Sequence, residues 1–250
     1  MATEPKKSSG PAEGLEPQHD RVPKRVWLWW SSGKDSAWTL HRLRSNPEVA
    51  VERLVTTITP HFGRVAIHGT RIEVLQAQAE AVGLPLETVE LPYPCTNDDY
   101  LDAVAPLLQR AASRSVDQMA FGDLFLEDIR EYRETLFAGT GIEPIFPLWQ
   151  EDTNAVAADM LRSGLEAYVT TLDPQRVDPS LAGVRYDDDF LRGLPDDVDP
   201  CGENGEFHTC VAAGPMMAHR LDLERGEIVE RGGFVYADLF ASHLGSKEGT

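Results

Sequence analysis

The sequence has no apolar run long enough to cross a membrane. The uninterrupted apolar stretch at the first expected strand is Val26 to Trp30, whereas a membrane-spanning helix needs about 20 apolar residues. The amino-terminal segment, residues 1–25, is polar and lacks the apolar centre of a secretory signal peptide. We therefore expect no membrane partner and a disordered tail at residues 1–24.

Cysteine is also scarce. The sequence contains three cysteines, Cys95, Cys201 and Cys210, and no pair of them is spaced as C-x-x-C. An odd number of isolated cysteines argues against a disulfide framework and against a four-cysteine zinc site. The cysteine content therefore predicts a reducing, cytoplasmic setting.

Basic residues are few compared with acidic ones. Lys and Arg total 23 and Asp and Glu total 41, which gives a formal net charge of −18. A protein that grips nucleic acid through a broad surface needs many basic side chains to neutralise phosphates. Nucleic acid is therefore not expected as a partner, although a small pocket for one nucleotide remains compatible with the charge.

Strand and helix patterns alternate from about residue 25. Short apolar or β-branched runs predict strands, and apolar residues at helical spacing predict helices. The expected strands are 26–30, 51–59, 86–91, 118–122, 144–149 and 166–171, and the expected helices are 36–44, 69–82, 97–113, 126–138 and 154–162. This alternation predicts an α/β fold with an open, mostly parallel twisted sheet and flanking helices.

The composition changes after about residue 172. Residues 173–200 are rich in Asp, Pro and Gly, and the aspartates between Asp187 and Asp199 are interpreted as a solvated linker. Strands are expected at 211–217, 228–230 and 234–236. We therefore expect a nucleotide-binding domain at 25–172, a smaller α+β substrate-binding unit at 173–241, and a loose tail at 242–250.

A candidate phosphate-binding loop follows the first strand. Its sequence, Ser31-Ser32-Gly33-Lys34-Asp35-Ser36, combines small residues, hydroxyls and a lysine at the start of a helix. Backbone N–H groups at a helix N-terminus bind anions well. The loop is not a Walker A motif, because Leu28 and Asp35 occupy positions where that motif needs Gly and Ser or Thr. The alternative is a simple helix N-cap.

This loop resembles the S-G-G-x-D-S pyrophosphate loop of the N-type ATP pyrophosphatases, in the adenine nucleotide alpha hydrolase-like superfamily. The resemblance implies that residues 31–36 bind ATP and Mg²⁺, with Lys34 and Asp35 catalytic and Asp35 on the metal. One position departs from the pattern, because Ser32 stands where the family has its first Gly. If this position needs a positive φ, the serine costs strain.

The wider sequence resembles the diphthine–ammonia ligase family over roughly residues 25–240. The resemblance is carried by Gly69 to Leu86, Phe121-Gly122-Asp123 and the segment Pro147-Leu148-Trp149, together with Arg130, Arg133 and the block from Gly202 to Thr209. It implies an ATP-dependent ligase that adenylates a carboxylate, releases AMP and pyrophosphate, and transfers ammonia. The implied acceptor is the diphthine of elongation factor 2, if the host makes diphthamide. A homodimer stays open.

The block from Gly202 to Thr209 concentrates polar chemistry. Glu203, Glu206 and His208 could bind ammonium, steer an amine, hold a metal or move a proton, since an unperturbed histidine has a pKa near 6.5. Within the same block, the expected substrate contacts are Gly202, Asn204, Gly205 and Thr209. The alternatives are a solvated polar loop and, with Cys201 and Cys210, a metal site whose spacing matches no standard zinc pattern.

Other candidates lie at expected strand and helix ends. Gly122 and Asp123 follow a strand at the edge where open parallel sheets bind ligands, and Thr57 and His68 are further nucleotide-binding candidates. Two of these residues have a structural alternative: Asp123 could cap a helix and His68 could lie on the surface.

Two arginines are candidates for the acceptor. Arg130 and Arg133 lie one turn apart on a helix and could clamp a carboxylate or phosphate. Arg130 could equally pair with Glu127 or Glu134 on a salt-bridged helix face.

The sequence therefore predicts a division of labour. The loop at residues 31–36 makes the adenylate, while residues 202–209 with Arg130 or Arg133 receive acceptor and ammonia. Two alternatives remain: a non-catalytic adenine-nucleotide sensor on the same fold, and a pyrophosphatase-type enzyme that acts on another small molecule or on RNA.

Overall fold

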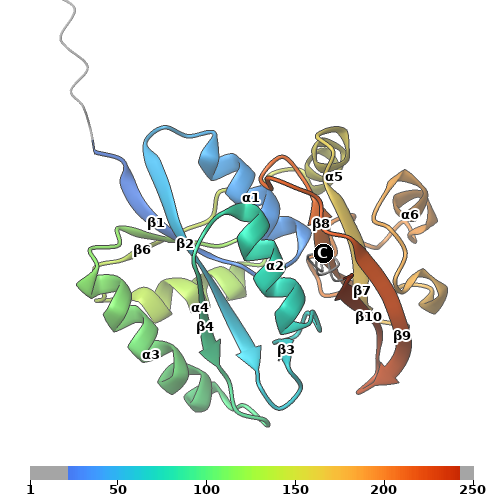
Figure 1. The fold of residues 1–250 in the computed structure, drawn as a ribbon, viewed down its shortest axis with the longest axis horizontal. Helices are drawn as coiled ribbons and strands as arrows, with labels where there is room; N and C mark the ends of the chain where they lie inside the picture. The colour runs from blue at the N-terminus through green and yellow to red at the C-terminus, as the bar shows by residue number, and fades with distance from the viewer. Residues whose placement is uncertain (1–21, 243–250) are drawn as a thin grey trace, which may run out of the picture.

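A computed structural model describes residues 22–242 (Figure 1). The tails expected at residues 1–24 and 242–250 lie almost entirely outside the described residues. Two sheets stand side by side, and helices α1 and α2 lie between them. Among the described residues, no helix combines the length and apolarity that a bilayer crossing requires.

The first sheet is mostly parallel, as the alternating pattern predicted. Its path runs β3-β2-β1-β5-β6, and β4 pairs with the far part of the long strand β2. Only the short β3 runs antiparallel, against β2. The strands are β1 (Lys24–Trp29), β2 (Val49–Thr59), β3 (Arg64–Val65), β4 (Leu86–Glu90), β5 (Gln118–Ala120) and β6 (Glu143–Ile145).

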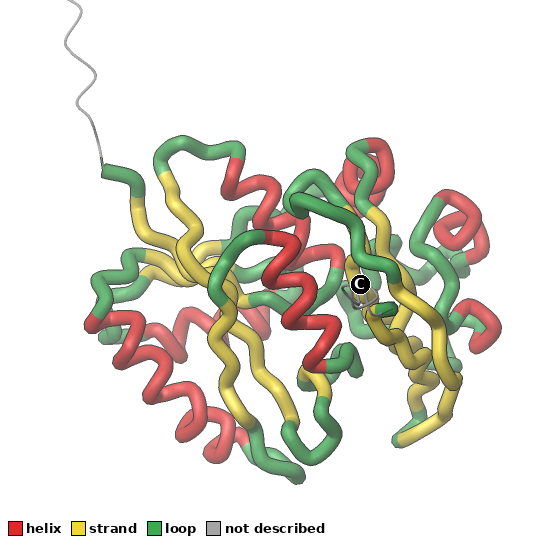
Figure 2. The backbone as a smooth tube through the Cα atoms, in the orientation of Figure 1, coloured by secondary structure: helices red, strands yellow, loops and turns green. Residues whose placement is uncertain are grey.

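Helices cover both faces of this sheet (Figure 2). Successive strand residues point to opposite faces, so Val26 and Leu28 pack with α1 and α2 while Trp27 packs with α3. Thr96 and Asp99 begin α3 with a capping box. The helices are α1 (Lys34–Arg44), α2 (Ile72–Val82), α3 (Asn97–Ser113), α4 (Glu127–Phe137) and α5 (Thr153–Arg162).

The second sheet is antiparallel, in the order β8-β7-β10-β9. Its strands are β7 (Glu166–Leu172), β8 (Phe207–Ala213), β9 (Leu223–Arg231) and β10 (Phe234–Ala241). Strand β7 pairs with β8 and β10, whereas the sequence analysis grouped it with the nucleotide-binding domain. The boundary at residue 172 stays a prediction. The fold class itself is confirmed: a mostly parallel sheet with flanking helices, plus a smaller unit at the carboxyl end.

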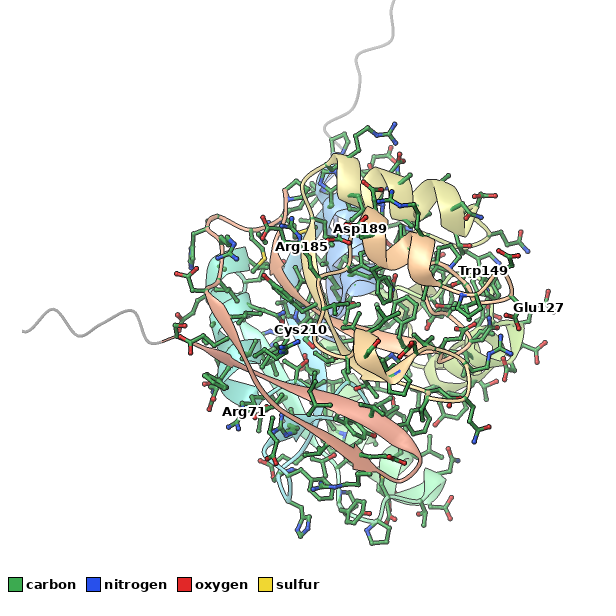
Figure 3. All side chains as sticks on the ribbon, turned by 90° about the vertical axis from the view of Figure 1, so that its right-hand side faces the viewer. Arg71, Glu127, Trp149, Arg185, Asp189 and Cys210 are labelled. Atoms are coloured by element: carbon green, nitrogen blue, oxygen red, sulfur yellow. The ribbon has the colours of Figure 1, made fainter. Side chains whose placement is uncertain are left out.

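The expected Asp-rich linker contains ordered structure. A 3-10 turn (Pro179–Leu181) and helix α6 (Asp188–Gly193) lie within the segment after β7. The linker interpretation was wrong for α6 because Asp187 is its N-cap and accepts the N–H groups of Asp189 and Phe190. Phe190 is buried against Phe207. Figure 3 views the molecule from this side, with α6, marked by Asp189, above the β9–β10 hairpin.

Candidate active site

A pocket of about 240 Å³ lies where the carboxyl edge of the first sheet meets the second unit. Both units line it, and it brings together sequence-predicted residues that are far apart in the chain. Those that line the pocket are Ser31, Gly33, Asp35, Ser36, His68, Gly122, Asp123, Arg133, Gly202, Glu203, His208 and Thr209. The predicted residues outside the lining are Ser32, Lys34, Thr57, Arg130, Asn204, Gly205 and Glu206.

The loop between β1 and α1 forms one wall of the pocket. Helix α1 has Gly33 as its N-cap, which has no side chain to bond the first-turn N–H groups. The side chain of Thr209, on β8, accepts one of these groups, the N–H of Lys34, at 3.1 Å. The positive end of α1 and the hydroxyls of Ser31 and Ser36 are therefore suited to an anion.

Gly122 brings the end of β5 against this loop. A Cβ atom at Gly122 would lie 3.0 Å from both the carbonyl carbon of Asp35 and the nitrogen of Ser36. A side chain at this position would push the loop backbone away, so glycine suits the close approach. The approach places the neighbouring Asp123 in the same pocket as the loop.

Ser32 adopts the strained conformation that its substitution for glycine implied. Its φ is 72°, which lies in the left-handed region. A residue that has a Cβ atom adopts this region only at a cost in free energy. The Ser32 hydroxyl donates to the hydroxyl of Thr70 at 2.7 Å, and the serine is fully buried. Ser32 therefore shapes the loop from behind and does not line the pocket.

Lys34 is buried away from the pocket lining. Its ammonium donates to Asp35 Oδ2 at 2.9 Å and to the carbonyl of Cys201. The ring centroid of Phe207 lies 5.3 Å from Nζ, within cation–π range. In this arrangement Lys34 ties the loop to the second unit, so the direct phosphate contact expected from the sequence has no geometric support.

Asp35 presents a free carboxylate oxygen. Its Oδ2 pairs with Lys34, whereas its Oδ1 is buried without a hydrogen-bond partner among the described residues. Burial raises the pKa of Asp35, and the Lys34 ammonium offsets this only in part. An unpartnered carboxylate oxygen beside an anion site fits Mg²⁺, which usually takes one or two carboxylates together with phosphates and water. Within residues 22–242, no three His, Cys, Asp or Glu side chains gather as a metal cluster.

Glu203 reaches the pocket from the second unit. Its Oε1 accepts the N–H of Leu124 at 2.7 Å and that of Phe125 at 3.4 Å, just beyond β5. Burial raises the pKa of Glu203 to about 7, although the Leu124 N–H opposes the rise. Both protonation states are therefore populated at neutral pH, as proton transfer requires.

Glu206 lies inside its own loop and not in the pocket. It is 2% exposed, and its Oε1 accepts from Asn204 Nδ2 at 2.9 Å and from the N–H of Asp199 at 3.3 Å. These hydrogen bonds hold together residues 199–206, the segment that contains Glu203. The geometry thus gives Glu206 a supporting place, where the sequence analysis expected it to face the substrate.

The two candidate arginines differ in position. Arg133 makes a two-bond ion pair with Asp123, at 2.5 and 3.1 Å, and both side chains line the pocket. Arg130 instead pairs with Glu134 at 2.7 Å and lies over the ring of Trp149. Arg130 therefore follows the salt-bridged helix alternative.

Thr57, a further nucleotide-binding candidate, lies in β2 and is also outside the pocket lining.

Two histidines that line the pocket, His68 and His208, lie next to each other. The ring centroids of His68 and His208 are 4.5 Å apart. Burial lowers the pKa of His208 to about 4, with a further contribution from the Lys34 charge. Burial, the neighbouring His208 and Lys34 lower the pKa of His68 well below its usual value. Both rings are therefore neutral at pH 7, and the near-neutral proton transfer expected of His208 loses its basis.

Sequence reasoning missed part of the lining. The missed residues are Trp29, Leu126 and Ile129. Phe121 and Phe207 lie in the quoted motifs without a role of their own, and Cys201 was named only for the alternative metal site. Trp29 belongs to the apolar run at residues 26–30, in which Trp27 and Trp30 are buried. As the last residue of β1, Trp29 stacks on Phe121 at the edge of the sheet. Its position at the carboxyl end of a parallel strand could have indicated that it lines the site, because open parallel sheets bind ligands at that edge.

Two glycines of the Gly202 to Thr209 block allow a matched stability test. Gly202 and Gly205 have φ of 69° and 85°, but only at Gly202 would a Cβ clash, 2.7 Å from the carbonyl oxygen of Phe207. Gly202→Ala is expected to lower the melting temperature clearly more than Gly205→Ala, since both pay the left-handed cost and one adds the clash. Thermal denaturation checks this, and equal shifts would contradict the described loop.

Two family models match this chain. One describes the diphthamide synthase N-terminal domain and matches residues 24–144, and the other describes the diphthamide synthase C-terminal domain and matches residues 152–238. A protein of Schizosaccharomyces pombe named diphthine–ammonia ligase is 27% identical over 221 residues, which cover 80% of this chain and 36% of that protein. A Danio rerio protein of the same name is 27% identical over 169 residues, covering 60% of this chain and 65% of that protein. The chain thus spans less than two thirds of either relative.

Proposed function

The chain belongs to the diphthamide synthase family, and we propose on this basis that it is an ATP-dependent ligase that converts a carboxylate into an amide with ammonia. The main support for the proposal is that one pocket is lined by both Asp35 and Glu203, whose carboxyl groups come from the two different units. Asp35 beside the N-terminus of α1 offers an unpartnered oxygen, and Glu203 enters from the second unit with a pKa of about 7. A nucleotide sensor needs only the first of these.

The loop wall would hold the nucleotide. The N–H groups at the start of α1 and the hydroxyls of Ser31 and Ser36 bind the β and γ phosphates and stabilise the charge of the departing pyrophosphate. Bound Mg²⁺ would neutralise phosphate charge, and Asp35 is the residue that would hold it. The acceptor carboxylate attacks the α phosphorus, so that AMP becomes attached to the acyl group.

The second unit would carry out amide formation. Glu203 takes a proton from the attacking nitrogen as the amide bond forms and AMP leaves. Residues 201–203 and 207–209 line the pocket beside the loop, where they would limit the access of water to an acyl group that would otherwise hydrolyse. His68 and His208, being neutral, bring no charge that would repel ammonium.

The acceptor is proposed from the names of the relatives, which give diphthine, and from the family resemblance of the sequence, which implies elongation factor 2. It is the diphthine side chain of elongation factor 2, or another carboxylate if the host makes no diphthamide. Of the two candidate arginines, Arg133 lines the pocket, so it would contact an acceptor carboxylate while its ion pair with Asp123 fixes the guanidinium. The predicted cytoplasmic location suits this substrate.

The proposal is tested with [¹⁵N]ammonium. Protein, ATP, Mg²⁺ and diphthine-bearing elongation factor 2 are incubated with the label, and the acceptor peptide is analysed by mass spectrometry. The expected result is ¹⁵N in an acceptor amide together with an equal amount of AMP. Control mixtures without ammonium or without ATP should give no amide. Unlabelled acceptor and intact ATP would support the sensor alternative.

A further inference from the structure

A buried glutamine lies directly behind the phosphate loop. Gln78, on α2, has no exposed surface, and its side-chain amide bonds three other segments. Its Oε1 accepts from Trp30 Nε1 at 3.0 Å, and its Nε2 donates to the carbonyls of Ser32 at 3.0 Å and Val211 at 2.8 Å. A buried amide is costly unless bonded, so these bonds fix the side chain in one orientation.

The bond to Ser32 acts on the strained position of the loop. The Ser32 carbonyl accepts from Gln78 and also from the N–H of Val211, at 3.0 Å. A trans peptide is planar, so its C=O and N–H point in opposite directions. A carbonyl held toward α2 and β8 therefore aims the next N–H, that of Gly33, away from them and toward Ser31 Oγ, which it reaches at 3.3 Å. Gly33 and Ser31 both line the pocket.

We propose that Gln78 is a positioning residue for nucleotide binding. It holds Ser32 in its left-handed conformation. This turns the Gly33 N–H to the pocket side of the loop, where it bonds Ser31 Oγ and would be available to a phosphate oxygen. Glycine would adopt this conformation without help, whereas serine needs the bonds that its carbonyl accepts from Gln78 and Val211 and the bond that its hydroxyl donates to Thr70. The inference rests on the proposed function, since it takes ATP as the ligand of the loop.

The test begins with Gln78→Met, which keeps the side-chain volume and removes the amide. The KM for ATP in AMP formation is expected to rise about tenfold, the scale of left-handed strain in a residue with a side chain. The kcat of the folded enzyme should stay within about threefold, because the Gly33 N–H would contact the phosphates in the ground and transition states alike. The N–H groups of α1, which stabilise the departing pyrophosphate in the proposed mechanism, are held by the helix and not by Gln78. Mere loss of folded protein would lower the apparent kcat and leave KM unchanged.

A matched control and a second variant support the measurement. Gln118, on β5, is also a buried glutamine, but it bonds Glu143 outside the pocket. Gln118→Met should therefore leave the KM for ATP unchanged. Gln78→Glu keeps an acceptor for Trp30 Nε1 and, when ionised, loses both donors. It should raise KM as Gln78→Met does, and it serves if the methionine variant does not fold.

The decisive comparison repeats Gln78→Met in a Ser32→Gly background. Glycine adopts the left-handed conformation without the bond from Gln78. In the Ser32→Gly background, Gln78→Met should therefore raise the KM for ATP less than about threefold. An equal rise in both backgrounds, or no rise with Ser32 present, overturns the positioning role while leaving ATP use intact. If the unsubstituted protein binds no ATP in calorimetry, the proposed function fails and the inference falls with it.

Discussion

Asp35→Asn is expected to slow AMP release at least about 100-fold, the loss typical of one positioned group that stabilises transition-state charge. Asparagine keeps an oxygen for the Lys34 bond at Oδ2, so the loop should stay folded. What it loses is the negative charge at the unpartnered Oδ1, and with it the proposed hold on Mg²⁺. AMP is measured by chromatography at saturating ATP and Mg²⁺.

Asp152→Asn is the matched control for this experiment. Asp152 caps α5 through its bond to the N–H of Ala155 and does not line the pocket. Asparagine caps helices as well as aspartate does, so AMP release should be unchanged. Near-normal AMP release by Asp35→Asn would remove Asp35 from the proposed mechanism.

Glu203→Gln is expected to slow amide formation about 100-fold and to change ATP affinity by less than about threefold. The glutamine oxygen can still accept the Leu124 N–H, so the contact that places residue 203 remains available. The variant lacks only the carboxylate that takes the proton. Calorimetry with ATP and mass spectrometry of the amide separate the two effects.

The pH dependence of Glu203 supplies a second check. Because burial raises its pKa to about 7, the base form is lost below that pH. Amide formation should therefore fall faster below pH 7 in the unsubstituted protein than in Glu203→Gln. Equal pH profiles would mean that another group takes the proton.

Protein stability should change in the opposite direction. The folded pKa of about 7 exceeds the ordinary value of 4.5, so the folded state binds the proton more tightly than the unfolded state. The resulting stabilisation is complete below pH 4.5 and is lost as pH rises through 7. Glu203→Gln should lose less stability over this range in chemical denaturation.

Local patterns predicted most of the fold. Helix α3 was predicted with its observed ends, because the capping residues and the apolar spacing agree there. The pairing partners of β7 could not be predicted from sequence. A short buried strand looks alike in either sheet, and only its pairing with β8 and β10 decides. Helix α6 was missed because three successive aspartates suggested solvent, whereas the first of them is its cap.

The candidate site was predictable in its residues but less so in their orientation. The motifs pointed to Asp35 and Glu203, and both line the pocket. They also pointed to Lys34 and Glu206, which are buried beside the pocket and bonded to backbone or neighbouring side chains. Sequence spacing cannot distinguish a charge that faces a ligand from one that fixes the loop. Gln78 lies in the segment from Gly69 to Leu86 but was not singled out there, because its hydrogen-bond partners come from separate segments.

Adenylation of the acceptor carboxylate is tested most directly by following the transfer of one oxygen atom. Diphthine-bearing elongation factor 2 is prepared with ¹⁸O in the acceptor carboxylate and incubated with ATP, Mg²⁺ and ammonium. If the carboxylate attacks the α phosphorus and ammonia then displaces AMP, one ¹⁸O is carried into AMP, and pyrophosphate is unlabelled. Mass spectrometry of the nucleotides should show this transfer. Label in inorganic phosphate together with ADP, or AMP formed without label, would contradict adenylation of the acceptor.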